Sequence, residues 1–251
     1  GNIGDVFGGN DESGVPSKDV YVYLNGGIIN NAFGGGNNSS VDITNIYLNG
    51  STVSKVYGGS NLTGDVTKTN VVSNSGTVNE IIGGNNIGGS VVDTSVIING
   101  ADILTSVYGG GNEASVSTTD VVLNKTTSKI PAIYGGGKKA SVTNTNVKLY
   151  SGEVKEVYGG SNESGNIATS KIITEATEKY YDSGVVMDVT YTAKDVTWES
   201  NQYKTVVDVN VAIKNSTDNV INKYDGTIKI DNSVLYNNYS QTDISEDNGI
   251  Y

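Results

Sequence analysis

The chain has 251 residues and a formal net charge of −11, and it contains no cysteine, no histidine and no arginine. These absences exclude disulfides, thiolate or imidazole catalysis and Cys/His zinc sites. The negative charge without guanidinium groups argues against binding to nucleic acid, and no apolar run is long enough for membrane insertion.

A glycine motif of the form Val-Tyr-Gly-Gly-x-Asn recurs seven times in the first two thirds of the chain. Its first glycine lies at positions 8, 34, 58, 83, 109, 135 and 159, so the copies are 24 to 26 residues apart. Such a period is typical of solenoids, in which each repeat buries its apolar side against its neighbours. We therefore predict an all-β fold in which residues 1–174 form a parallel β-helix of about seven coils of 24–26 residues.

A second block recurs in similar form before the glycine motifs, and residues 66–74 are one copy of it. Its alternation predicts that Val66, Val71 and Ser73 point inward, together with Thr69 on the same parity. We use the word column for the equivalent positions of successive coils. The column of Thr69 comprises Thr44, Thr69, Thr94, Thr119, Thr145 and Ser170. Stacked threonines can pass a hydroxyl hydrogen bond from coil to coil, which would satisfy each buried hydroxyl.

Two outward columns follow from the same alternation. The polar column comprises Asn45, Asn70, Ser95, Asp120, Asn146 and Lys171, which suits a solvated face. The apolar column comprises Tyr47, Val72, Ile97, Val122, Lys148 and Ile173. An exposed apolar stripe of this kind indicates either a docking surface or strand propensity alone.

A short segment leads into each glycine motif, as in residues 53–57. Two polar residues between inward Val53 and Val56 imply a corner there, and by alternation Tyr57 then points out and Gly58 points in. We expect corners at the Gly-Gly-x-Asn motif and at Asn-Gly pairs such as Asn49-Gly50, because glycine and asparagine tolerate positive φ. Parallel stacking would then place one buried row through four coils, made of Val56, Ile81, Val107 and Ile133.

The pattern changes after the last glycine motif. In residues 175–251, alternating runs such as 185–191 and 207–213 are separated by turn chemistry at residues 215–219 and 224–226. Half-buried antiparallel strands with hairpin turns predict a small β-sandwich, which either leans on the solenoid or is cut short at Tyr251. At the other end the repeat begins in the middle of a coil, so we expect further coils or a capping domain before Gly1 in a longer chain.

A resemblance to known proteins lies in the Val-Tyr-Gly-Gly-Gly-Asn copies, each followed by Ala/Ser-Ser-Val and a threonine-rich strand. Residues 1–174 resemble the glycine-rich repeats of large secreted or wall-attached proteins of anaerobic gut and rumen bacteria, which are similar to parallel β-helix adhesins. The resemblance implies a β-helix at the cell surface. The fold does not select one function, because β-helices also carry lyases, glycosidases and phage tailspikes.

Aromatic residues are the candidate ligand contacts. The residue before each glycine pair forms a column, broken by Ile82, of Phe7, Phe33, Tyr57, Tyr108, Tyr134 and Tyr158. If this column faces solvent, its rings could stack on the pyranose faces of a polysaccharide; the alternative is a space-filling stack beside the glycines. Trp198 is a second candidate platform for a sugar ring, with core or interface as its alternative.

Calcium binding is one interpretation of the acidic residues. Acidic residues follow the glycine corners at Asp11, Glu12, Asp65, Glu113 and Glu163. Their oxygen atoms suit calcium, but the nine-residue repeat of calcium β-rolls is absent, so solvated corners are the favoured interpretation. The acidic residues Asp243, Glu246 and Asp247 are interpreted in the same way. We expect no bound cofactor.

These patterns lead to an expectation for function. Coils of 24–26 residues leave no long loops, and no column is acidic throughout, so we expect no enzyme activity. We expect a non-catalytic adhesion or stalk module, extracellular or at the cell surface, whose partner is a polysaccharide or a host or partner surface protein. The alternative is a carbohydrate-binding module of a secreted system that degrades plant cell-wall glycans.

Overall fold

The computed structural model describes residues 1–174, 176–182, 185–199, 202–215, 229–230 and 233–234, with side chains for residues 1–174. The chain divides into two units, Gly1–Glu175 and Ala176–Tyr251, and each is described by itself. In the described part of the chain, no helix has the length and apolar character needed to cross a membrane.

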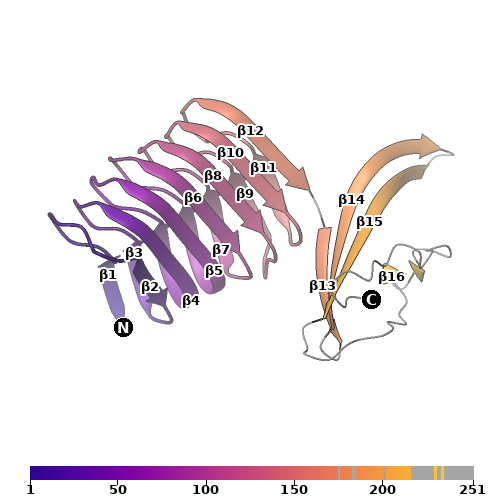
Figure 1. Ribbon diagram of the computed structural model, residues 1–251, viewed down its shortest axis with the longest axis horizontal. Helices are drawn as coiled ribbons and strands as arrows, with labels where there is room; N and C mark the ends of the chain where they lie inside the picture. Colours follow the sequence, from indigo (N-terminus) through magenta and orange to yellow (C-terminus); the bar gives the residue numbers. More distant parts are fainter. Residues whose placement is uncertain (175, 183–184, 200–201, 216–228, 231–232, 235–251) are drawn as a thin grey trace. The chain divides into compact units, whose positions relative to one another are not determined.

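The first unit is the predicted parallel β-helix, which is confirmed. Strands of successive coils lie side by side along the unit (Figure 1). The strands are β1 (Asn2–Phe7), β2 (Val20–Leu24), β3 (Ile28–Phe33), β4 (Val41–Tyr57), β5 (Val66–Ile82), β6 (Val91–Ile98), β7 (Asp102–Tyr108), β8 (Val116–Leu123), β9 (Ile130–Tyr134), β10 (Val142–Leu149), β11 (Val154–Tyr158) and β12 (Ile167–Thr174). They all pair in parallel.

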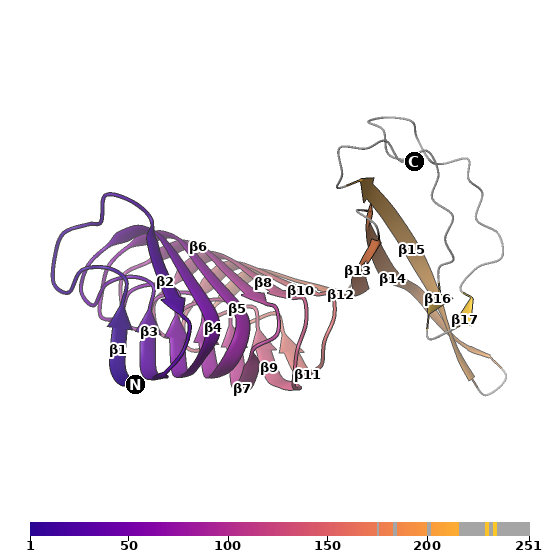
Figure 2. The ribbon, with the colours of Figure 1, turned by 90° about the horizontal axis from the view of Figure 1, so that it is seen from below.

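Two parallel ladders form the walls of the solenoid (Figure 2). One ladder contains β2, β6, β8, β10 and β12, the other contains β1, β3, β7, β9 and β11, and the long strands β4 and β5 pair in both. Val56 pairs with Ile81, Ile81 with Val107, and Val107 with Ile133. All four are 0% exposed, so the predicted buried row exists. One turn of the backbone therefore corresponds to one sequence repeat.

The buried side chains of this unit form three separate clusters. The largest lies between the two ladders and contains aliphatic residues such as Val71, Ile81 and Ile103. A second contains the aromatic column, and a third consists of the first valine of successive strands, with Val66, Val91, Val116 and Val142 as members. The third cluster has members only from Val66 onward, because Val41, the equivalent valine one coil earlier, belongs to the largest cluster.

The threonine column points inward as predicted, but its hydrogen bonds differ from the prediction. Each threonine Oγ1 donates to the carbonyl oxygen of the first corner glycine in its own coil, at 2.6 Å, in the pairs Thr44–Gly58, Thr69–Gly83, Thr94–Gly109, Thr119–Gly135 and Thr145–Gly159. Paired threonines of neighbouring coils lie on strands about 4.8 Å apart, beyond hydrogen-bond reach in the stacking direction. The expected relay from threonine to threonine is therefore wrong, and the hydroxyls brace each coil across its interior.

The corner glycines also have a different role from the one expected. Positive φ occurs at the second type of corner, at Gly50 (151°) and Gly100 (143°), but not at the first glycine of the Gly-Gly motif. There the carbonyl oxygen of one coil points at the glycine of the coil before: a Cβ atom on Gly135 would lie 2.6 Å from the Gly159 oxygen. Close approach between backbones, and not left-handed conformation, explains glycine at these positions.

Replacing Thr119 with valine is expected to lower the free energy of unfolding by about 1 to 3 kcal/mol, because the buried Gly135 carbonyl oxygen loses its donor while the volume stays the same. Thr118→Val is the matched control, since Thr118 is exposed on the same strand. Thermal unfolding followed by circular dichroism measures both. Equal melting temperatures for the two variants would contradict the bracing role.

The second unit is antiparallel in the described residues. β13 (Ala176–Asp182), β14 (Val185–Glu199) and β15 (Gln202–Asn215) form a three-stranded sheet, and β16 (Lys229–Ile230) pairs with β17 (Ser233–Val234). These strands include the alternating runs on which the prediction was based. The packing of two sheets against each other stays a prediction.

Candidate binding surfaces

The aromatic column forms a continuous stack on either side of Ile82. Ring centroids lie 4.8 Å apart for Phe7–Phe33, 4.7 Å for Phe33–Tyr57, 5.1 Å for Tyr108–Tyr134 and 5.0 Å for Tyr134–Tyr158, with interplanar angles of 10° or less. This spacing follows from parallel pairing of the strands that carry the rings. The rings therefore face each other along the axis.

The middle of this column is buried. Phe33, Tyr57, Ile82 and Tyr108 are each at most 5% exposed, and burial, helped by the charge of Glu80, raises the pKa of Tyr57 to about 12. The faces of the rings from Phe33 to Tyr108 are therefore not accessible to a sugar. Burial of this kind is the geometry expected for a space-filling stack beside the glycines. At one end Tyr158 is 45% exposed and its hydroxyl donates to Glu156. 

The remaining candidate ligand contacts are Phe7, Tyr134 and Trp198. Phe7 and Tyr134 are partly buried against the same cluster. Trp198 lies in β14 opposite Tyr203 in β15, and its side chain lies outside the described residues. The prediction of a sugar platform at Trp198 therefore stays a prediction.

An asparagine ladder runs beside the aromatic column. In the segment after each glycine pair, Asn61 donates to Asn37, Asn86 to Asn61 and Asn112 to Asn86, at 2.8 to 2.9 Å between Nδ2 and Oδ1. Lys138 interrupts the ladder, and Asn162 beyond it donates to the Tyr108 hydroxyl at 3.2 Å. This bond places one corner side chain against the hydroxyl edge of a ring in the column.

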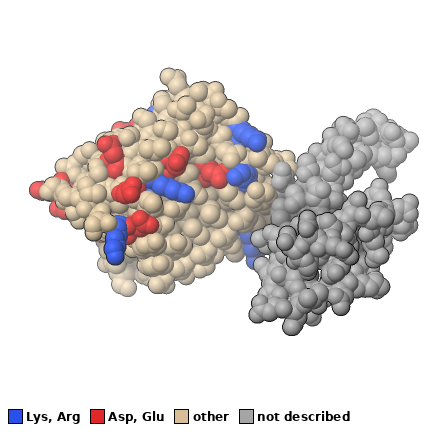
Figure 3. All heavy atoms as spheres, in the orientation of Figure 1, with Lys and Arg blue, Asp and Glu red and all other residues tan. Residues whose placement is uncertain are grey.

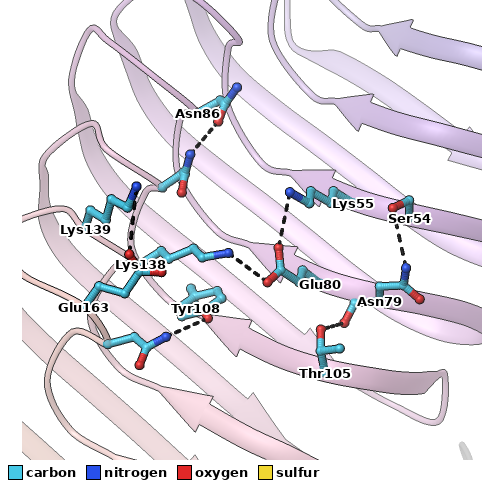
Figure 4. A network of polar contacts seen from close by, with 12 residues as sticks. Ser54, Lys55, Asn79, Glu80, Asn86, Thr105, Tyr108, Lys138, Lys139 and Glu163 are labelled. Carbon is cyan, nitrogen blue, oxygen red and sulfur yellow. Dashed lines mark hydrogen bonds and ion pairs between the residues drawn. The ribbon is translucent and has the colours of Figure 1, made fainter.

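Lys138 makes a cluster of charges with two earlier coils (Figure 4). Its Nζ lies 3.0 Å from one oxygen of Glu80, and the Nζ of Lys55 lies 3.6 Å from the other. Burial lowers the pKa of Lys138, but the hydrogen bond and charge of Glu80 outweigh burial, so the pKa is raised. Lys138 also lies 6.0 Å from the centroid of the Tyr108 ring. This cluster ties distant coils together.

Two of the five acidic corner residues, Glu113 and Glu163, pair with a lysine. Glu113 and Glu163 each lie 3.8 Å from Nζ of Lys139. Figure 3 shows both signs of charge interspersed on one face of the unit. Among the described residues, no group of three or more acidic side chains converges on a point that could hold a metal ion.

The two outward columns of the first ladder are less exposed than expected. Tyr47, Val72, Ile97 and Val122 are half-buried, and Asn45 is buried. Asn70 donates to Asn45 at 3.0 Å, because equivalent side chains of neighbouring coils stack and cover each other. The expected exposed stripe and solvated face are therefore both partly closed by this stacking.

An open groove runs along the start of β6, β8, β10 and β12. It is lined by equivalent residues of successive coils, among them Ser90, Ser115 and Ser141 before the first valine of each strand and Ser117 and Thr143 after it. Its lining is mostly hydroxyls and valine. No aromatic or charged side chain lines it.

Tyr21 and Tyr23 are the exposed aromatic residues that the sequence analysis missed. They lie on β2, are 53% and 58% exposed, and alternate with buried Val20, Val22 and Leu24. Their centroids are 6.4 Å apart with an interplanar angle of 9°. The period-two pattern Val-Tyr-Val-Tyr-Leu was the available signal, but it lies outside the glycine motif.

Comparison with protein-family models, with curated proteins and with solved structures finds no significant match to this chain.

Proposed function

We propose that this chain is a non-catalytic adhesion and spacer module of a bacterial surface or secreted protein, which holds its partner by repeated equivalent contacts. The observation that carries the proposal is an outward asparagine ladder at the corners of successive coils, which include the pairs Asn49-Gly50 and Asn99-Gly100. Nδ2 of Asn49, Asn74, Asn99 and Asn124 donates to Oδ1 of the asparagine one coil earlier, beginning at Asn25, at 2.9 to 3.0 Å.

This ladder is an array of identical polar groups. Each internal bond uses one of the two hydrogens on Nδ2, so the remaining N–H and an oxygen lone pair of every amide are available outside. The groups repeat at about 4.8 Å, which is the spacing between parallel strands. Many weak contacts at fixed spacing raise the overall affinity without a deep site.

The carboxylates of the solenoid support a non-catalytic role. Glu80 and Asp120 lie 3.0 and 3.2 Å from lysine Nζ atoms, and Glu113 and Glu163 share Lys139 as their ion-pair partner, at 3.8 Å each. A glycosidase needs two carboxyl groups converging on one bond. The second unit completes the proposal as a small β-sandwich, which its antiparallel sheet supports.

The second candidate is a carbohydrate-binding module of a secreted system that degrades plant cell-wall glycans. The exposed pair of Tyr21 and Tyr23 favours it, because aromatic rings stack on the apolar faces of sugars. It differs from the first candidate in needing one discrete site.

The adhesion proposal is tested with beads coated with the full chain, held against mucin, cellulose or xylan surfaces under flow. Retention on at least one surface is expected, rising steeply with the density of chains on the bead. The variant Asn74→Ala/Asn99→Ala, which interrupts this asparagine ladder, is expected to reduce retention. Asn79→Ala is the control, because Asn79 is an exposed asparagine of β5 outside the asparagine ladder, and it should retain like the wild type. No retention on any surface, or equal retention of both variants and the wild type, would disprove the proposal.

A further inference from the structure

We infer that the open groove along β6, β8, β10 and β12 binds one uncharged glycan chain, which lies along the solenoid axis and is held by the hydroxyls of serine and threonine. The groove is lined by equivalent residues of successive coils, so it is elongated in the direction in which the coils stack. This site deepens the carbohydrate-binding candidate of the proposed function, on which it rests, and it involves neither the asparagine ladder nor the aromatic column.

The groove opens sideways, between coils that continue on both sides of it. Val116 and Val142 pair with each other, and their outer neighbours are Val91 on one side and Ile167 on the other. Ser117 and Thr143, which follow Val116 and Val142, are exposed although a coil stacks on either side of each. Their exposure therefore does not depend on an end of the solenoid.

Small side chains determine where the groove lies. The exposed column that follows these valines contains Val92 in β6 and then Ser117, Thr143 and Ala168 in β8, β10 and β12. Val92 is 49% exposed and does not line the groove, whereas the three smaller residues do. The groove has a volume of about 350 Å³, within the usual range of ligand sites. Strand spacings of about 4.8 Å give it a length of roughly 14 Å, enough for a short run of pyranose rings.

The groove presents hydroxyls that the fold does not use. Ser115, Ser117 and Thr143 are exposed, and in the described part of the chain their side-chain oxygens take part in no hydrogen bond. Ser141 Oγ accepts from the backbone N–H of Asn166 at 3.0 Å, which leaves its own O–H as a donor for a ligand. Each hydroxyl can both donate and accept, which matches the hydroxyls of a sugar.

Two other classes of polymer fit the groove less well. A peptide strand that extends a sheet needs unpaired backbone groups. Here the backbone N–H groups of Val91, Val116 and Val142 donate to carbonyl oxygens of the next coil at 2.9 to 3.2 Å, and β8 and β10 pair on both sides. A nucleic acid needs cations against its phosphates, whereas no lysine of the described residues lines the groove and the net charge of the chain is −11.

The spacing of the hydroxyls favours an extended glycan. Equivalent hydroxyls, such as those of Ser117 and Thr143, repeat once per coil at about 4.8 Å. An extended glycan repeats its own hydroxyls once per sugar ring, over a length close to this spacing. One sugar can therefore meet one coil, and the contacts of successive coils add in a single bound chain. Because no aromatic ring of the described residues lines the groove, we expect weak, millimolar binding.

The test titrates cellohexaose, xylohexaose or mannohexaose into the isotope-labelled full chain and follows the backbone amides by NMR. At least one hexasaccharide is expected to give saturable shifts centred on residues 115–117 and 141–143. The variant Ser115→Ala/Ser117→Ala/Thr143→Val removes three hydroxyls and should weaken binding about tenfold, since each neutral hydrogen bond contributes a factor of roughly two or more. Thr118→Val, exposed beside Ser117 but outside the groove, should bind like the wild type.

Three results would overturn the inference: no shift with any hexasaccharide, equal affinity of the triple variant and the wild type, or an equal loss in Thr118→Val. All the substituted residues are exposed, so the variants should keep the wild-type circular dichroism spectrum, which separates lost binding from lost folding. Concentration-dependent shifts of the same amides without glycan, abolished in the triple variant, would also overturn it and assign the groove to a second copy of the chain.

The inference and the proposed function fail separately. Saturable shifts that lie only outside the groove would reject the groove and keep the carbohydrate-binding candidate. Bead retention that depends on Asn74 and Asn99, without any response to a hexasaccharide, would reject the groove and still support the adhesion proposal.

Discussion

Replacing Tyr108 with alanine is expected to lower the free energy of unfolding by about 3 to 5 kcal/mol, the usual cost of removing a buried aromatic ring. The ring is 2% exposed, stacks on Tyr134 at 5.1 Å and receives a hydrogen bond from Asn162 at 3.2 Å. Its loss would leave a cavity that the rigid coils cannot close. The melting temperature, followed by circular dichroism, should fall by roughly 6 to 20 °C.

Tyr158→Ala is the control for this substitution. Tyr158 belongs to the same column but is 45% exposed, so its loss should cost about 1 kcal/mol or less. A similar, small effect of both substitutions would mean that the column is not a structural stack. A Tyr108→Ala variant of wild-type stability that loses glycan binding would restore the column as a ligand surface.

Replacing Gly135 with valine is expected to cost about 2 to 4 kcal/mol, through overpacking and a lost hydrogen bond. A Cβ atom at this position would lie 2.6 Å from the Gly159 carbonyl oxygen and 3.0 Å from Cγ2 of Val147. The same oxygen accepts the bond from Thr145, so the coil cannot move away without breaking that bond. The expected fall in melting temperature is roughly 5 to 15 °C.

Gly4→Val provides the comparison for Gly135→Val. A Cβ atom at Gly4, in β1, has no neighbouring atom within 4 Å, and the residue is exposed. A valine there should leave the melting temperature within about 2 °C of the wild type, since surface substitutions rarely exceed roughly 0.5 kcal/mol. Equal effects at the two positions would show that close approach of backbones is not the reason for glycine at the corner.

The sequence alone determined the repeating part of this protein. The period of 24 to 26 residues predicted one coil per repeat, and alternation placed Val56 and Thr69 inside, because both patterns are local consequences of strand geometry. The antiparallel strands of the second unit were visible in the same way. The candidate site was predicted less well: the aromatic column was found, and Tyr21 and Tyr23 were not.

Only the tertiary structure decided which partners these side chains meet. The acceptor of Thr119 is a glycine carbonyl 16 residues away, and Lys138 reaches Glu80 across 58 residues. Whether an outward ring is exposed depends on what folds back over it, which buries Tyr108 and leaves Tyr23 open. Periodicity specifies the direction of a side chain from its own strand, whereas contacts depend on the distances between coils and corners that the folded chain sets.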